Sequence, residues 1–131
     1  MNNTVTFYKT NSAHILIIDD NALVLRNMKV LLDDKYSVSV AASATQAYMA
    51  MEKRKPNLIL LDYEMPEMNG KDLYIKLKQD EAYKDIPIVF LTSAADADIV
   101  QRLLSLRPAG YILKPVNAIN LMSVIEDVLR G

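Results

Sequence analysis

The chain has 131 residues, the length of one ordinary domain, so we expect a single hydrophobic core. Its 15 basic and 16 acidic residues give a net charge of −1, which argues against nonspecific binding to nucleic acid or to a membrane surface. Because the chain has no cysteine and one histidine, disulfides, thiolate sites and histidine clusters are excluded, and any metal must bind oxygen ligands, as magnesium and calcium do.

The first segment, 1–12, is polar and lacks the apolar centre of a signal peptide. We predict that it is a flexible tail that precedes a domain at 13–131. No apolar run in the sequence approaches the roughly 18 residues of a membrane span. The sequence therefore predicts a cytoplasmic domain that does not enter a membrane.

Five short apolar runs predict β-strands, at 14–18, 37–41, 57–61, 86–91 and 111–113. Three of them are nearly continuous, the second alternates with serine, and the last is the shortest. Continuous apolar runs of this length are typical of parallel strands that are covered on both faces.

Residues at helical spacing lie between these runs. Ser43 and Gln46 form a capping box for the second helical segment, and Asn117 is a suitable cap for the last one. Pro108 requires the fourth helix to end at or before Arg107. Strand and helix therefore alternate five times, which predicts an α/β fold with five helices and right-handed crossovers.

Polar side chains follow the predicted strands at the point where each strand ends. Asp19 and Asp20 follow the first strand, Asp62 the third, Thr92 the fourth and Lys114 the fifth. In open parallel sheets, ligands bind at this carboxyl edge. Three carboxylates at one edge repel one another unless a cation lies among them, and Mg²⁺ suits such ligands. With a lysine and a hydroxyl beside them, this pattern predicts phosphoryl transfer, with an aspartate as the nucleophile.

Four segments carry a resemblance to a known family: 17–21, 60–70, 90–94 and 110–115. They resemble the acidic pair, the phosphoacceptor segment, the switch-hydroxyl strand end and the lysine–proline turn of the receiver domain of two-component response regulators. Together they extend the resemblance over nearly the whole chain. The resemblance implies a flavodoxin-like, doubly wound five-stranded parallel sheet in the order 2-1-3-4-5.

The resemblance also implies the role of each acidic residue. Asp62 would accept a phosphoryl group from a partner histidine kinase or phosphotransfer protein. Asp20, Asp62 and the backbone carbonyl of Glu64 would bind Mg²⁺ directly, and Asp19 would act mostly through water. We also hypothesise that the negative charge of Glu64 affects the attack of water on the phosphoryl group.

Two further residues would respond to phosphorylation in such a domain. Lys114 would pair with one phosphoryl oxygen, and Thr92 would move to bond another. Tyr111 would follow Thr92 inward, and the Lys114–Pro115 peptide bond would be cis. The change would control a downstream effector or output domain through the face formed by the fourth helix, the fifth strand and the last helix.

Several partner interactions stay open. A phosphorylation-dependent homodimer is compatible with the broad apolar surface of the last helix, although partial burial against the neighbouring helix is the preferred explanation of that surface. The stretch from Arg107 to Gly110 lacks the acidic pair found in receivers that dimerise on DNA, so salt bridges of that type are in doubt. We expect no direct binding of nucleic acid by this domain.

Simpler interpretations exist for each residue taken alone. Asp19, Asp20 and Asn21 would also cap the first helix, Lys114 alone would be a solvated charge, and Tyr111 alone would be a core aromatic. His14, at the opposite sheet edge, is assigned to structure. Taken together, the residues favour a phosphoacceptor signalling domain that catalyses at most its own phosphorylation and dephosphorylation. The alternatives are a magnesium-dependent phosphatase and a phosphorylation-independent interaction module.

Overall fold

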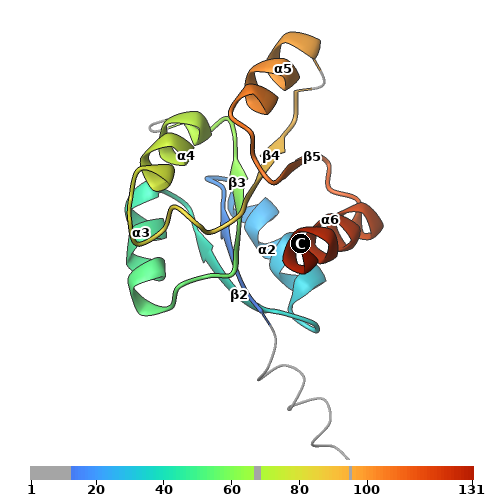
Figure 1. Ribbon diagram of the computed structural model, residues 1–131. Coiled ribbons are helices and arrows are strands. Elements are labelled where there is room, and N and C mark those ends of the chain that lie inside the picture. Colours follow the sequence, from blue (N-terminus) through green and yellow to red (C-terminus); the bar gives the residue numbers. More distant parts are fainter. Residues whose placement is uncertain (1–12, 67–68, 95) are drawn as a thin grey trace, which may run out of the picture.

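The computed structural model describes residues 13–66, 69–94 and 96–131, in which five strands alternate with five helices (Figure 1). The predicted tail at 1–12 lies outside the described residues. In chain order the elements are β1 (His14–Ile18), α2 (Ala22–Leu32), β2 (Ser37–Ala41), α3 (Ala44–Lys53), β3 (Leu58–Asp62), α4 (Gly70–Lys78), β4 (Ile88–Thr92), α5 (Ala97–Ser105), β5 (Gly110–Leu113) and α6 (Ala118–Arg130).

The strands form one parallel sheet in the order β2-β1-β3-β4-β5, which confirms the predicted architecture. Three predicted strands differ from the structure in their bounds. Asp62 and Thr92 are the last residues of β3 and β4 rather than the residues after them, β3 begins at Leu58, and β5 begins at Gly110. At the other end, β4 begins at Ile88, after Pro87, which has no N–H to donate to the sheet.

Helices cover both faces of the sheet (Figure 1). The helices α3, α4 and α5 pack on one face of the sheet, and α2 and α6 pack on the other. Each face has one cluster of buried side chains between the helices and the sheet. Successive residues of the central strands point to opposite clusters, as Ile17 and Ile18 do on β1. Full burial of β1, β3 and β4 explains why their sequences are continuously apolar.

Side-chain caps start the helices where the sequence predicts them. The Ser43 hydroxyl accepts a hydrogen bond from the backbone N of Gln46 at 3.1 Å, and Asn117 caps α6 in the same way. The Gln46 side chain in turn accepts from the backbone N of Ala42 at 2.8 Å, one residue before the usual capping-box donor. At its other end, α5 finishes at Ser105, so the predicted stop before Pro108 is confirmed.

Three aromatic rings connect the end of β3 with the C-terminus of α5. Between ring centroids, Phe90 packs edge-on against Tyr63 at 5.2 Å and in a tilted arrangement, at 37°, against Tyr74 at 5.1 Å. The Tyr74 hydroxyl donates its one hydrogen to the carbonyl oxygen of Leu106 at 2.9 Å and shares it with that of Arg107 at 3.2 Å. A tyrosine on α4 therefore satisfies carbonyl groups that the end of α5 leaves without a helical partner.

Tyr74→Phe is expected to lower the free energy of unfolding by about 1 kcal/mol, because it removes the hydroxyl and leaves the ring packing intact. Urea denaturation followed by circular dichroism measures the loss. Tyr48→Phe is the matched control, since the Tyr48 hydroxyl is buried without a hydrogen-bond partner in the described part of the chain and its removal should cost nothing. Equal effects of the two substitutions would contradict the capping role of Tyr74.

Candidate functional site

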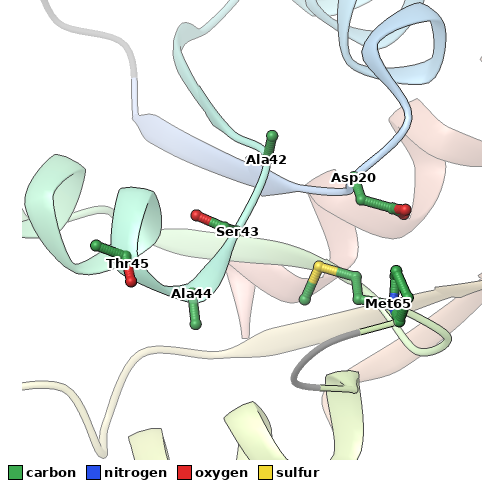
Figure 2. A pocket seen from close by; sticks show the side chains of 7 residues that line it. Asp20, Ala42, Ser43, Ala44, Thr45 and Met65 are labelled. Carbon is green, nitrogen blue, oxygen red and sulfur yellow. The ribbon is translucent and has the colours of Figure 1, made fainter.

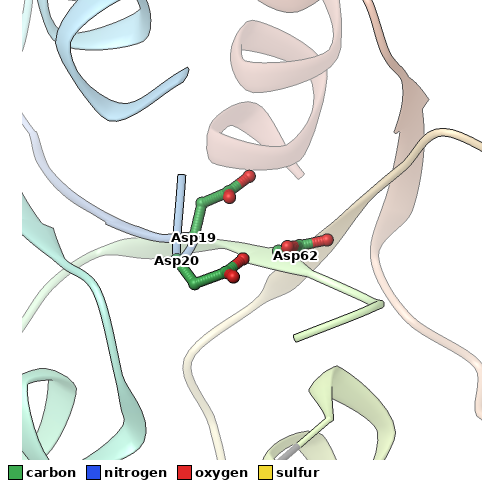
Figure 3. A group of neighbouring side chains, drawn as sticks. All are labelled: Asp19, Asp20 and Asp62. Carbon is green, nitrogen blue, oxygen red and sulfur yellow. The ribbon is translucent and has the colours of Figure 1, made fainter. Parts of the chain in front are cut away.

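Three carboxylates converge at the carboxyl edge of the sheet (Figure 3). Asp19 and Asp20 follow β1, and Asp62 ends the neighbouring strand β3. Each offers a carboxylate oxygen, and these three oxygens lie within 4.8 Å of one another. Asp19 and Asp62 are buried whereas Asp20 is exposed, so the cluster opens to solvent on one side.

Lys114 contributes a positive charge to this cluster from the end of β5. Its Nζ lies 2.6 Å from Asp19 Oδ2 and 3.4 Å from Asp62 Oδ1. A hydrogen bond from its backbone N to the carbonyl of Thr92 fixes the start of the turn, and the Lys114–Pro115 bond is cis, as the resemblance implies. Lys114 is therefore not the solvated charge of the simpler interpretation, and its closer partner is Asp19.

Burial raises the pKa of the Asp62 carboxyl to about 6. The backbone N of Glu64, which donates to Asp62 Oδ1 at 3.1 Å, acts in the opposite direction, and the nearby charge of Asp19 adds to the increase. Burial alone would lower the pKa of Lys114, but its hydrogen bond to Asp19 and the charge of Asp62 raise it overall. The ammonium thus stays charged beside a carboxyl that ionises only near neutral pH.

The carboxylate cluster has unused capacity for a cation. Asp19 Oδ1 accepts a hydrogen bond from the backbone N of Asn21 at 2.9 Å. Asp19 Oδ2 is buried and pairs with the Lys114 ammonium at 2.6 Å, whereas the exposed Asp20 carboxylate faces solvent. Two buried carboxylates and an exposed one form a set of hard oxygen ligands, which could hold a divalent cation.

A hollow of about 530 Å³ lies on the solvent side of the cluster (Figure 2). The Asp20 side chain faces it, with Met65 on the side of the β3–α4 loop. The start of α3, from Ser43 to Thr45, forms the opposite wall. Small solutes can therefore reach the exposed carboxylate of the cluster from solvent.

Thr92 is fully buried at the end of β4, and its hydrogen-bond partner is Glu64, for which the sequence predicts another role. Its Oγ1 donates to Glu64 Oε1 at 2.9 Å, and the same Glu64 oxygen accepts from the backbone N and the hydroxyl of Ser93 at 3.1 and 3.3 Å. From the sequence we predict roles for the charge of Glu64 and for its backbone carbonyl, but the sequence does not predict this contact. In the sequence, the only indication of this contact is that an acidic side chain lies two residues after Asp62.

Tyr111 lies on β5, in register with Phe90, and its half-buried ring packs against the core on the side of α3, α4 and α5. Within the described residues it makes no hydrogen bond to Thr92. The structure therefore brings Asp19, Asp20, Asp62 and Lys114 together and holds Thr92 through Glu64. Tyr111 stands at the neighbouring strand, apart from these contacts.

The simpler interpretations hold for two residues. Asn21 caps α2 by accepting from the backbone N of Leu23 at 2.9 Å, so the capping interpretation applies to it and not to Asp20. His14 is buried at the opposite edge, hydrogen-bonded to the hydroxyls of Ser37 and Ser39, which confirms its structural assignment. Burial, with the nearby charge of Arg54, lowers its pKa.

Comparison with known proteins agrees with this geometry. The sequence model of the response regulator receiver domain matches residues 15–126. The phosphate regulon transcriptional regulatory protein PhoB of Pseudomonas aeruginosa is 37% identical over 117 residues, which cover 88% of this chain and 51% of PhoB. Hybrid signal transduction histidine kinase D of Dictyostelium discoideum is 29% identical over 119 residues, 91% of this chain and 8% of the kinase.

The fold has close counterparts among solved structures. The chemotaxis protein CheY4 of Vibrio cholerae superposes with a TM-score of 0.82 at 26% identity, covering 89% of this chain and 98% of CheY4. This chain spans about half the length of PhoB and a small part of the histidine kinase, so the matched region is one domain of each of those longer proteins.

Proposed function

Because this chain belongs to the response regulator receiver domain family, we propose that Asp62 accepts a phosphoryl group from a partner histidine kinase or phosphotransfer protein. One observation carries the proposal. The buried Asp62 carboxylate lies beside Asp19 and Asp20 and within 3.4 Å of the Lys114 ammonium. This arrangement suits a nucleophile that reacts with an anionic group.

In the proposed reaction, an Asp62 oxygen forms a bond to phosphorus while the bond from phosphorus to the donor's imidazole nitrogen breaks. The nitrogen keeps the electron pair and gains a proton from solvent. Lys114, already next to Asp62 Oδ1, pairs with a phosphoryl oxygen. Bound Mg²⁺ would neutralise negative charge on the phosphoryl group, and Asp19, Asp20, Asp62 and the backbone carbonyl of Glu64 would hold it.

Phosphorylation is proposed to favour a second conformation of the domain. Thr92 then bonds the phosphoryl group, and Tyr111 on β5 moves inward. The partner that reads this change is an effector or output domain at the face of α5, β5 and α6, where Leu104, Leu113 and Ile119 expose apolar side chains. None of the described helices is long and apolar enough to cross a membrane. The cytoplasmic location and the phosphorylation-dependent homodimer stay predictions.

Intact-mass measurement tests this function. The protein is incubated with Mg²⁺ and a small phosphodonor such as acetyl phosphate, beside an Asp62→Asn variant. The wild type is expected to gain one phosphoryl group and the variant none, because the amide of the variant is a poor nucleophile.

Other outcomes would overturn parts of the proposal. Gain of mass by both proteins would mean that another residue is the nucleophile. Gain by neither, together with no binding of Mg²⁺, would favour the phosphorylation-independent interaction module. Turnover of an external phosphomonoester would favour the phosphatase instead.

A further inference from the structure

We propose that Glu64 acts as a latch on the Thr92 hydroxyl. Its carboxylate accepts hydrogen bonds from the Thr92 and Ser93 donors that a phosphoryl group on Asp62 would need. The latch thereby holds the domain in its unphosphorylated conformation. The inference rests on the proposed function of Asp62 and Thr92. It assigns Glu64 a positioning role that acts through Thr92.

The latch is made by one carboxylate oxygen. Glu64 Oε1 accepts from Thr92 Oγ1 at 2.9 Å, from the backbone N of Ser93 at 3.1 Å and from the Ser93 hydroxyl at 3.3 Å. Thr92 Oγ1 in turn accepts from the backbone N of Ala94 at 3.2 Å. The buried hydroxyl is therefore held on both its donor and its acceptor side.

Competition follows from the number of hydrogens available. A hydroxyl has one hydrogen to donate, and so does a backbone amide. While Thr92 and Ser93 donate to Glu64, neither can make a full hydrogen bond with the same hydrogen to a phosphoryl oxygen. The phosphorylated conformation therefore requires Glu64 to leave, and the three bonds to its carboxylate oppose that step.

Repulsion between the phosphoryl group and the Glu64 carboxylate would release the latch. The backbone N of Glu64 donates to Asp62 Oδ1, which places the residue beside the phosphoacceptor carboxylate. A phosphoryl group on Asp62 would compete for the donors that the Glu64 carboxylate now holds, and its negative charge would repel that carboxylate as the two approach the same donors. Glu64 thus shifts the balance between two conformations, in favour of the unphosphorylated one while Asp62 is free.

Affinity for beryllium trifluoride, a tetrahedral analogue of the phosphoryl group, tests the latch at a fixed Mg²⁺ concentration by isothermal titration calorimetry. Glu64→Ala is expected to tighten binding about tenfold, since it frees the Thr92 donor and the two Ser93 donors. Glu52→Ala removes the same charge from the exposed end of α3 and is expected to change nothing. In a Thr92→Ala background the gain from Glu64→Ala should fall to about twofold, because only the Ser93 donors remain to be freed.

An equal gain in both backgrounds would overturn the latch, because charge repulsion alone acts whether or not Thr92 has a hydroxyl. An unchanged affinity in Glu64→Ala would overturn it as well. Failure of the wild type to bind beryllium trifluoride would refute the proposed function of Asp62.

A second measurement does not depend on any phosphoryl analogue. In ¹H–¹⁵N spectra of the unmodified protein, Glu64→Ala is expected to move the Ser93 amide proton upfield and to speed its exchange with solvent, while the Asp98 amide, bonded to Asp96, stays in place. An unmoved Ser93 amide would overturn the latch, whatever the outcome at Asp62.

Discussion

Gly70→Ala is expected to destabilise the domain by about 3 kcal/mol, at the upper end of overpacking effects, and to prevent the proposed phosphorylation of Asp62. A Cβ atom at Gly70 would overlap the carbonyl oxygen of Asp62 and lie 2.6 Å from Tyr63 Cα. Both atoms belong to the backbone, so no side chain can rotate to make room. The hydrogen bond from the Gly70 backbone N to the Tyr63 carbonyl, at 3.0 Å, holds the start of α4 against this strand end.

Urea denaturation of the wild type and variant measures the first effect, and intact mass after phosphodonor treatment measures the second. Gly110→Ala is the matched control, since a Cβ there would meet its nearest neighbour, a Val124 side-chain carbon, at an ordinary 3.6 Å. We expect it to change the free energy of unfolding by less than about 1 kcal/mol. Similar losses at both positions would show that the close approach at Asp62 is not what requires Gly70.

Asp62→Asn is expected to stabilise the metal-free protein by about 2 kcal/mol at neutral pH, because it removes a buried negative charge. Burial raises the pKa of Asp62 to about 6 in the folded protein, from an ordinary value of 3.8. The folded state thus binds the proton more tightly than the unfolded state. The contribution of Asp62 to wild-type stability is therefore fully present below its ordinary pKa of 3.8. It is lost as the pH rises through the pKa of about 6 that Asp62 has in the folded protein.

Chemical denaturation in the presence of a chelator, at several pH values between 4 and 8, measures this effect. The difference between variant and wild type should be small near pH 4 and complete above about pH 7. Added Mg²⁺ should then stabilise the wild type more than the variant, because only the wild type keeps all three carboxylates. A difference that does not change with pH would contradict a raised pKa at Asp62.

The sequence predicted what depends on local patterns and on the geometry of parallel sheets. The caps at Ser43 and Asn117 depend on residues a few positions apart, and the structure confirms them. The meeting of Asp19, Asp62 and Lys114 follows from the rule that parallel strands end at one edge. That rule needs only the order of elements, which the apolar runs supply.

Other contacts of the site could not be predicted, because they depend on side-chain rotation. Glu64 and Thr92 lie 28 positions apart in the sequence, and nothing local indicates that a carboxylate on one loop reaches a hydroxyl on another strand. The same holds for Lys114, which lies closer to Asp19 than to the proposed phosphoacceptor. The Tyr74 hydroxyl at the end of α5 is a third case, since the sequence indicates only a residue on a helix.

The three packed rings of Tyr63, Phe90 and Tyr74 limit how this domain can vary. Each ring contacts the next, and the first follows Asp62 directly while the last holds the end of α5. Substitutions at residues in contact have non-additive effects, with interaction energies of about 0.5 to 3 kcal/mol. A larger or smaller ring at one of these positions is therefore expected to be tolerated best when another changes with it, so the shape of the strand that ends in Asp62 and the position of α5 depend on each other.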